Sequence, residues 1–200
     1  MLDQNSQRLC VLFAGNSGAG KDAAADILAN ELESRGCSTS RTAFADPIKE
    51  LAVHLLGIPK SISYGSQQDK LDFEVYGKSA RQHLQWIGTE MGRNQIHTDI
   101  WIHRFVERAL ESNARVVIGS DLRFRNEMAV TRAMLDNKMS MKVVKIINPR
   151  VPVNLEHQSE REIYNTPDDA FDLVIHNTKG LKDLRSLIML LANELLKQTA

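Results

Sequence analysis

LCVLFAGNSGAGKD, residues 9–22, joins an apolar run to a glycine-rich loop and to the start of a helical pattern. The apolar run, residues 9–14, is typical of a strand that is buried on both faces of a parallel sheet. Residues 15–21 follow with the spacing Gly-x4-Gly-Lys. Glycines are needed there because successive backbone N–H groups must curl around a phosphate, and a Cβ would block the curl. The stretch therefore predicts a phosphate-binding loop at the end of a central strand.

This loop is the pattern of an ATP site. The N-terminus of the next helix adds partial positive charge, and Lys21 is expected to bridge the β- and γ-phosphates. A plain glycine-rich turn is the alternative, but the buried strand before the loop and the amphipathic helix after it favour phosphate binding. Asp22 replaces the usual Ser or Thr, so we expect it either to bind Mg²⁺ or only to favour the first helical turn. The expected ATP contacts in the loop are Gly15, Asn16, Ser17, Gly18, Ala19, Gly20, Lys21 and Asp22.

Beyond the loop, short apolar runs alternate with longer helical patterns, which predicts the α/β class with a parallel sheet flanked by helices. The polar residues 57–78, interrupted by Pro and Gly, are predicted to form a mobile loop on the substrate side, and residues 148–170 an irregular segment. The first strand and four more make five in one domain. We expect the four at residues 38–43, 115–119, 142–147 and 173–176, and helices at residues 22–35, 47–56, 79–91, 98–112, 124–137 and 181–197.

Composition limits the partners of the chain. Its 200 residues include 25 Lys and Arg and 25 Asp and Glu, so no net field draws it to a nucleic acid polymer or an anionic membrane. The apolar stretches are too short to span a bilayer, and the start, MLDQNSQRL, does not resemble a signal peptide. Two cysteines, Cys10 and Cys37, are typical of reduced thiols. We expect a cytoplasmic protein.

Ser120 and Asp121 follow the strand expected at residues 115–119, and ligand sites of α/β proteins lie at the carboxyl ends of such strands. P-loop enzymes carry an acidic residue beside the magnesium there, so Asp121 is a candidate metal ligand and catalytic residue. Helix capping by Ser120, Asp121 or Glu127 is the alternative. Arg123 and Arg125 favour a functional role, because they place two fixed cations beside the carboxylate.

Further candidates lie in polar segments. A lid with Arg150 and Arg161 would exclude water and stabilise charge on a transferred phosphoryl group, and a long surface loop is the alternative. The turn at residues 176–180 offers Asn177 and Thr178 as a place for an adenine ring. Residues that fit an acceptor site, or alternatively a solvated helix surface or a helix cap, are Asp46, Arg81 and Arg93. Histidines without trustworthy metal-ligand spacing are His54, His83, His97, His103 and His176.

With these motifs the chain resembles the bacteriophage-type deoxynucleoside monophosphate kinases over nearly its whole length. The resemblance rests on GNSGAGKDAAADIL, FADPIKE, RQHLQWIGTEMGR followed by DIWI, SDLRFRNE, EHQSERE and DLVIHNTKGLKDL, in this order. It implies the nucleoside monophosphate kinase fold in a single domain, with a monophosphate-binding insertion at residues 57–112 and a lid at residues 148–170. The implied activity is transfer of the γ-phosphoryl group of ATP, with Mg²⁺, to a deoxynucleoside monophosphate. Implied catalytic residues are Lys21, Asp121, Arg150 and Arg161, implied metal ligands are Asp22 and Asp121, and implied substrate contacts are Asp46, Arg81, Arg93, Trp101, Asp121, Arg123 and Arg125.

Two alternatives stay open at this point. Dephospho-coenzyme A and phosphomevalonate kinases share the loop and arginine-rich acceptor sites, and they differ in the acceptor. A slowly hydrolysing nucleotide-binding regulator is less favoured, because the chain lacks an Asn-Lys-x-Asp guanine signal. The accepted bases, the selectivity for deoxyribose and the presence of a homodimer are also open, and for a viral protein the compartment would be the host cytoplasm.

Overall fold

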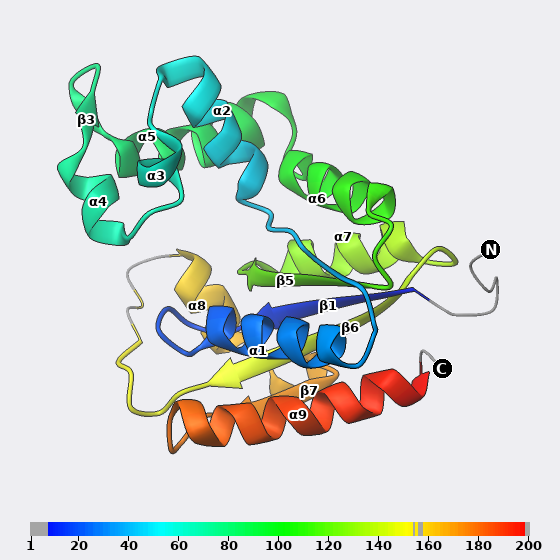
Figure 1. The fold of residues 1–200 in the computed structure, drawn as a ribbon. Coiled ribbons are helices and arrows are strands. Elements are labelled where there is room, and N and C mark those ends of the chain that lie inside the picture. The colour runs from blue at the N-terminus through cyan, green and yellow to red at the C-terminus, as the bar shows by residue number, and fades with distance from the viewer. Residues whose placement is uncertain (1–7, 154, 156–157, 199–200) are drawn as a thin grey trace. The chain divides into compact units, whose positions relative to one another are not determined.

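A five-stranded parallel sheet forms the framework of the computed structural model, which describes residues 8–153, 155 and 158–198 (Figure 1). β1 (Leu9–Ala14) is the central strand, and all of its residues are buried. The strand order is β2-β5-β1-β6-β7, and every pairing in the sheet is parallel. The expected α/β fold with five parallel strands is therefore confirmed. The other strands are β2 (Thr39–Arg41), β5 (Val116–Leu122), β6 (Ser140–Ile147) and β7 (Leu173–His176).

Helices cover both faces of this sheet. α1 (Lys21–Ser34) and α9 (Leu181–Gln198) pack together on one face, in a core that includes Val11 and Phe13 of β1. α7 (Arg125–Leu135) lies on the opposite face (Figure 1). Because successive side chains of a strand point to opposite faces, a strand covered on both sides needs an apolar residue at every position. This explains the unbroken run LCVLFA.

The chain divides into two compact units. The first, residues 1–42 and 106–200, contains the sheet, and the second is residues 43–105. The second unit has its own core around Ala52, Ile58 and Trp101. Residues 57–78, predicted to be a mobile loop, are instead folded, because apolar side chains spaced along this polar stretch, Ile58 above all, pack into that core. The elements of the unit are α2 (Asp46–Leu56), α3 (Lys60–Ser63), α4 (Gln67–Asp72), the hairpin β3 (Glu74–Val75) and β4 (Lys78–Ser79), α5 (Ala80–Trp86), η1 (Ile87–Ile96) and the start of α6 (Ile100–Glu111).

The element η1 is a π-helix, where the sequence predicts the continuation of an α-helix to residue 91. Gly92 allows Trp101 to approach the backbone, since a Cβ at residue 92 would lie 2.3 Å from Cζ2 of the indole. The indole Nε1 of Trp101 donates a hydrogen bond to Gly88 O at 2.7 Å. This π-helix carries Arg93, one of the residues expected to contact a substrate.

Three other predictions of local structure need correction. β2 is shorter than the expected strand at residues 38–43, and β5 runs on through Ser120 and Asp121 because Leu122 still pairs with Ala14. The irregular segment 148–170 contains the helix α8 (Gln158–Asn165) and the short 3-10 helix η2 (Asp168–Ala170). The inward face of α8 is formed partly by Glu160, so the helix lacks the apolar stripe by which helices are recognised in a sequence.

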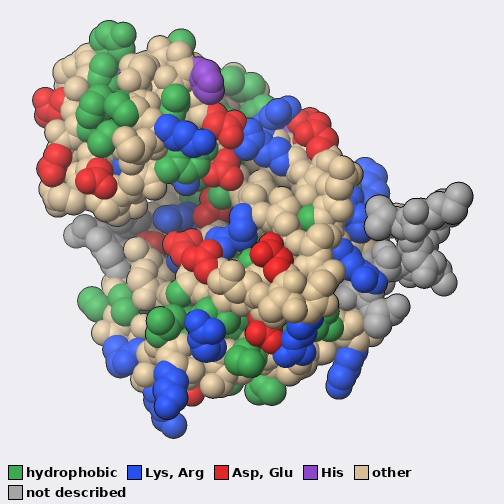
Figure 2. All heavy atoms as spheres, in the orientation of Figure 1, with side chains coloured by type: hydrophobic (Ala, Val, Ile, Leu, Met, Phe, Trp, Pro, Cys, Tyr) green, Lys and Arg blue, Asp and Glu red, His purple; other side chains and the backbone are tan. Residues whose placement is uncertain are grey.

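The surface has mixed charge. On the face shown in Figure 2, Lys and Arg side chains are interspersed with Asp and Glu side chains. Cys10 and Cys37 are both buried and free. None of the helices in the described part of the chain combines the length and apolarity that a membrane crossing requires.

Candidate nucleotide and metal site

The glycine-rich loop after β1 has the backbone of a phosphate-binding loop. Gly15 and Gly20 have φ values of +144° and +107°, which side chains with a Cβ rarely adopt. A Cβ at Gly15 would also lie 2.3 Å from the carbonyl oxygen of Ile146 in β6. α1 begins at Lys21, so the positive end of its dipole is at the loop. The strand, loop and helix expected from the sequence are therefore present.

Lys21 is buried although it carries a charge, and only 8% of it is exposed. Its Nζ donates a hydrogen bond across the loop to Asn16 O at 2.8 Å. Burial, helped by the charge of Arg123, lowers the pKa of Lys21 from 10.5 to about 8, while Glu160, Asp22 and Asp121 oppose this shift. A desolvated ammonium group interacts strongly with phosphate, because the low dielectric weakens screening. The position suits the expected phosphate contact.

Glu160 of α8 binds the loop with its carboxylate. Its Oε2 accepts hydrogen bonds from Ser17 N at 2.8 Å and from Asn16 Nδ2 at 2.9 Å. The same Nδ2 donates to the carbonyl oxygen of Glu160 at 3.1 Å, and Arg123 Nη1 lies 3.9 Å from Oε1. Only 7% of Glu160 is exposed. The loop therefore already holds one anionic group, supplied by its own chain.

Asp22, where the loop departs from the usual motif, is joined to the strand β5. Ser120 Oγ donates a hydrogen bond to Asp22 Oδ1 at 2.5 Å. Arg41 Nη2 donates to the same hydroxyl oxygen at 3.2 Å, and Arg41 also forms an ion pair with Asp26. Asp22 and Asp26 lie one turn apart on α1, so both face β2 and β5. The result is a polar network beside the loop.

The donors in this network fit Mg²⁺. This ion prefers oxygen ligands and is held by one or two protein groups together with phosphate and water oxygens. Asp22 and Ser120 provide a carboxylate and a hydroxyl, and Asp121 is the next residue of β5. Among the described residues, no group of three or more His, Cys, Asp or Glu side chains could hold a metal ion.

The turn after β5 is shaped by Glu127. Its Oε2 accepts hydrogen bonds from Arg123 N at 2.7 Å and from Phe124 N at 3.1 Å, at the start of α7. Ser120 and Asp121 lie within β5, so they do not cap this helix. Of the capping residues considered from the sequence, Glu127 alone has that role.

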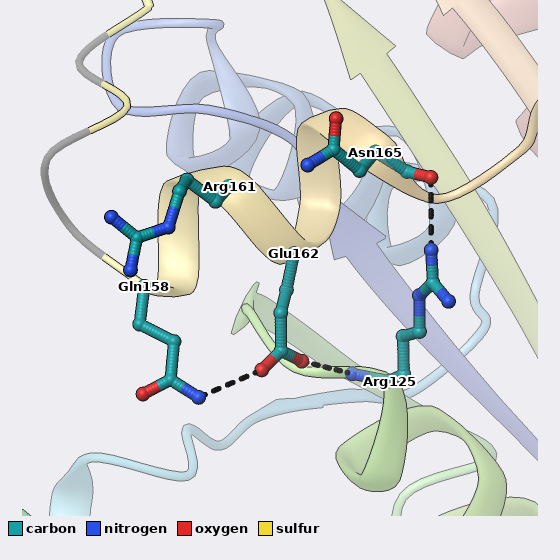
Figure 3. A pocket seen from close by; sticks show the side chains of 5 residues that line it. All are labelled: Arg125, Gln158, Arg161, Glu162 and Asn165. Atoms are coloured by element: carbon teal, nitrogen blue, oxygen red, sulfur yellow. Dashed lines mark hydrogen bonds between the residues drawn. The ribbon is translucent and has the colours of Figure 1, made fainter.

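Arg125, expected to bind the monophosphate, holds α8 in this structure (Figure 3). Its Nη2 donates to Asn165 O at 2.9 Å, its Nε donates to Thr166 Oγ1 at 3.0 Å, and its backbone N donates to Glu162 at 3.3 Å. A cation at the carboxyl end of a helix is favourable, because the last carbonyl groups carry partial negative charge. Its role as a phosphate contact stays a prediction. The pocket drawn in Figure 3 is lined by Arg125, Gln158, Arg161, Glu162 and Asn165.

The lid arginines lie in different surroundings. Arg150 is next to the turn after β7, since a Cβ at Gly180 would be 3.4 Å from Nη2 of Arg150. Asn177, in the same turn, is buried, and its Nδ2 donates to Ala19 O of the loop at 3.2 Å. Thr178 of this turn is exposed. Arg161 is exposed, and its Nη1 donates to Leu155 O at 2.9 Å. The structure thus brings Arg150, Asn177 and the loop together. The residues Glu156 and His157 of the EHQSERE motif lie outside the described residues.

The other expected substrate contacts lie in the second unit. The carboxylate of Asp46 accepts a hydrogen bond from Ala43 N at 2.9 Å at the start of α2, in place of the expected N-cap position. Arg81 Nη1 donates to Gln67 Oε1 at 3.2 Å. Trp101 is 6% exposed and packs in the core of its unit. Arg93 lies in η1. Their roles toward a substrate stay predictions.

Glu160 and Arg41 are site residues that the sequence reasoning did not single out. Glu160 is two residues before Glu162 in a charged run, and no spacing rule separates a carboxylate that reaches a loop 143 residues away from one that faces solvent. Arg41 ends an edge strand, where a cation is usually a solvated residue. The acidic residue at position 22 was the one signal in the sequence for this network, because a carboxylate in that position needs a hydrogen-bond donor or a cation nearby.

The chain is similar to known kinases in part of its sequence and in its fold. No protein-family model matches the chain. The deoxynucleoside-5'-monophosphate kinase of Escherichia phage T5 is 29% identical over 87 residues, which are 42% of this chain and 35% of that protein. The chain therefore matches about a third of the length of this curated relative. The match is compatible with the resemblance drawn from the motifs.

Solved structures with a similar fold include the Mycobacterium tuberculosis APS kinase CysC in complex with AMPPNP and APS. It has a TM-score of 0.51 and 14% identity, with 96% of this chain and 98% of that chain covered. A cysteine-to-alanine mutant of the same kinase has a TM-score of 0.51 and 15% identity, with 96% and 97% covered. At this identity the likeness shows the fold alone, which is that of the P-loop kinases.

Proposed function

We propose that the chain is a phosphotransferase that uses Mg-ATP to phosphorylate deoxynucleoside monophosphates to diphosphates. The observation that carries this proposal is the buried Lys21 at the N-terminus of α1, next to a loop whose glycines Gly15 and Gly20 take positive φ values. The P-loop kinase fold and the partial similarity to the phage T5 kinase support it.

In this proposal the first unit binds ATP. Lys21 exchanges its hydrogen bond to Asn16 O for the β- and γ-phosphates, and it stabilises the charge that moves toward the bridging oxygen in the transition state. Arg150 and Asn177 border the place proposed for the adenine ring. Mg²⁺, when bound, neutralises phosphate charge, and Asp22 with residues of β5 would hold it.

The acceptor is proposed to be a deoxynucleoside monophosphate on the strength of the motifs and the T5 match. Its phosphate is a dianion that suits the bidentate guanidinium group. Candidates for this clamp are Arg81, Arg93, Arg123 and Arg125. Homodimer formation and a cytoplasmic location also stay predictions.

The clamp is tested by changing each of the four arginines to Lys. Substitution of an arginine that belongs to the clamp should raise the KM for the monophosphate by about tenfold or more and leave the KM for ATP within about twofold of wild type. Because Arg125 also holds α8, its variant should lose some thermal stability as well. If all four monophosphate KM values stay unchanged, the acceptor site lies elsewhere.

One panel of assays tests the function itself. Purified protein with ATP and Mg²⁺ is offered each deoxy- and ribonucleoside monophosphate, and separately dephospho-coenzyme A, phosphomevalonate and adenylyl sulfate, while ADP release is followed. Turnover with one or more deoxynucleoside monophosphates, absent in Lys21→Ala, is the expected result. Turnover with another acceptor alone would support kinase activity and would contradict the proposal that the acceptor is a deoxynucleoside monophosphate.

A further inference from the structure

The usual P-loop arrangement places a hydroxyl on the loop and a carboxylate on the neighbouring strand, and both hold the metal. In this chain the residue after Lys21 is a carboxylate in place of the hydroxyl, and β5 carries a hydroxyl, Ser120, directly before the carboxylate of Asp121. Asp22 lies in the first turn of α1, directly after the loop, and Ser120 lies in β5. The two groups are in direct contact, since Ser120 Oγ donates to Asp22 Oδ1 at 2.5 Å.

A change of register brings Ser120 to this position. β1 and β5 pair as Leu12 with Gly119 and then as Ala14 with Leu122, so β5 carries one extra residue between these pairs. Such bulges redirect side chains and are common next to active sites. Ser120 is buried, with 8% of its surface exposed, whereas Asp22 is exposed. The hydroxyl is therefore held within the fold, and the carboxylate faces solvent.

The hydrogen-bond inventory of the pair leaves room for a metal ion. A serine hydroxyl has one proton and two lone pairs. In Ser120 the proton goes to Asp22, and Arg41 Nη2 donates to one lone pair at 3.2 Å. One lone pair of Ser120 is left for a ligand, and the carboxylate of Asp22 is exposed. The charge of Arg41 is balanced by its ion pair with Asp26.

We propose that Asp22 and Ser120 together anchor the Mg²⁺ of bound ATP as a pair, in which Asp22 supplies the charge and Ser120 supplies the hydroxyl. This inference rests on the proposed function. It differs from a role for Asp22 in the first helical turn, which needs neither Ser120 nor the metal.

Exchanging the two residues tests the proposal. Three variants are needed: Asp22→Ser, Ser120→Asp and the double exchange of both residues. The readout is binding of AMPPNP by titration calorimetry across a Mg²⁺ series and in EDTA, which requires no turnover. The Mg²⁺ concentration that gives half of the maximal increase in AMPPNP affinity should rise about tenfold in each single variant. In the double exchange this concentration should be within about threefold of the wild-type value.

Controls separate the metal from the fold. Asp22→Asn keeps an oxygen that accepts from Ser120 and removes the charge, so its Mg²⁺ requirement should rise with little loss of Tm. Glu31→Gln removes a carboxylate from the same helix, paired there with Arg35, and should leave the Mg²⁺ series unchanged. Unchanged Mg²⁺ series in all pair variants, or a double exchange no better than the worse single variant, would overturn the pairing while the kinase proposal stands. Wild-type protein that binds AMPPNP equally with Mg²⁺ and with EDTA would overturn both.

Discussion

Lys21 carries its charge in a buried position, and this opposes folding. Its pKa in the folded chain, about 8, is below the ordinary value of 10.5, so the unfolded chain binds more protons between these values. Stability therefore rises as the pH increases from about 8 to 10.5, and the penalty is fully present below about pH 8. The proposed phosphate contact needs the same charge. Function and stability make opposite demands on this residue.

The variant Lys21→Met is expected to raise Tm by a few degrees at pH 7, because it replaces a desolvated ammonium group by an apolar side chain of similar length. Turnover should fall by at least about a thousandfold. Thermal unfolding at pH 7 and at pH 10.5 measures the first effect, which should shrink at the higher pH. A lower Tm at both pH values would show that Lys21 stabilises the fold.

The pH dependence of turnover follows from the same group. In the nucleotide-free protein Lys21 loses its proton as the pH rises through about 8, so kcat/KM for ATP should fall by about tenfold per pH unit above this value. Bound phosphates hold the proton on Lys21, so kcat should begin to fall at higher pH than kcat/KM. Lys21→Arg, which keeps its charge, is the control and should lack the alkaline fall in kcat/KM. A flat profile to pH 10 in the wild type would contradict this account.

At this scale the sequence was informative where a backbone rule applied. Gly15 and Lys21 could be predicted because a phosphate loop demands them at fixed spacing. Asp22 was recognised as a departure, but its partner Ser120 was assigned to a helix cap or to a place beside the magnesium. The sequence does not reveal that β5 gains one residue before Leu122, and this extra residue directs Ser120 toward α1.

Among the elements, α8 connects most parts of the site. Its carboxyl end is held by Arg125 and, through Thr166 O, by the buried Lys145 at 3.0 Å. Near its start, Glu160 holds Ser17 and Asn16 of the loop. A helix fixed at both ends can hold the shape of the loop without contacting the nucleotide.

Breaking the contact at the loop should have two effects. Glu160→Ala leaves Ser17 N without its acceptor and Asn16 Nδ2 with only the carbonyl oxygen of residue 160, which should cost about 1–3 kcal/mol of stability by thermal or denaturant unfolding. Glu160→Gln keeps an acceptor oxygen but loses a charge that raises the pKa of Lys21, so the alkaline fall in kcat/KM should move to lower pH. Glu162→Gln, on the same helix but without a contact to the loop, should leave the pH profile unchanged. If the alkaline fall in kcat/KM of Glu160→Gln occurs at the same pH as in the wild type, the charge of Glu160 does not influence the pKa of Lys21.

Element prediction succeeded where apolar periodicity was strong and failed where polar residues face inward. β1, α1, α2 and α9 match their expected ranges because apolar residues define the buried face. α8 was missed because Glu160 and Thr166 occupy buried positions with polar partners. Residues 57–78 were read as a loop, since α3, α4 and the hairpin are each too short to show a period.

On the scale of the whole molecule, two of the candidate acceptor residues belong to a different unit from the residues proposed to bind ATP. The residues proposed to bind ATP belong to the first unit, whereas Arg81 and Arg93 belong to the second. Trp101 supports the second unit from its core. Damage to this core should therefore affect the acceptor before it affects ATP.

Trp101→Ala tests this separation. Removal of a buried tryptophan costs about 3–5 kcal/mol, so the second unit should loosen and turnover should fall by about a hundredfold. The Kd for AMPPNP should stay within about threefold of wild type in calorimetry at low temperature. The chain offers a matched control in Trp86, which is 42% exposed, and Trp86→Ala should lose less stability and activity. Loss of AMPPNP binding in parallel with turnover would contradict the separation.

We propose that the loop at residues 15–22 serves phosphoryl transfer to a nucleotide acceptor. The most direct measurement is single-turnover transfer from [γ-³²P]ATP, with Mg²⁺ and each deoxynucleoside monophosphate in turn, for wild type and Lys21→Ala. Label is expected on a deoxynucleoside diphosphate with the wild type, and none above background is expected with the variant. Label that appears only as inorganic phosphate, or equal transfer by both proteins, would contradict it.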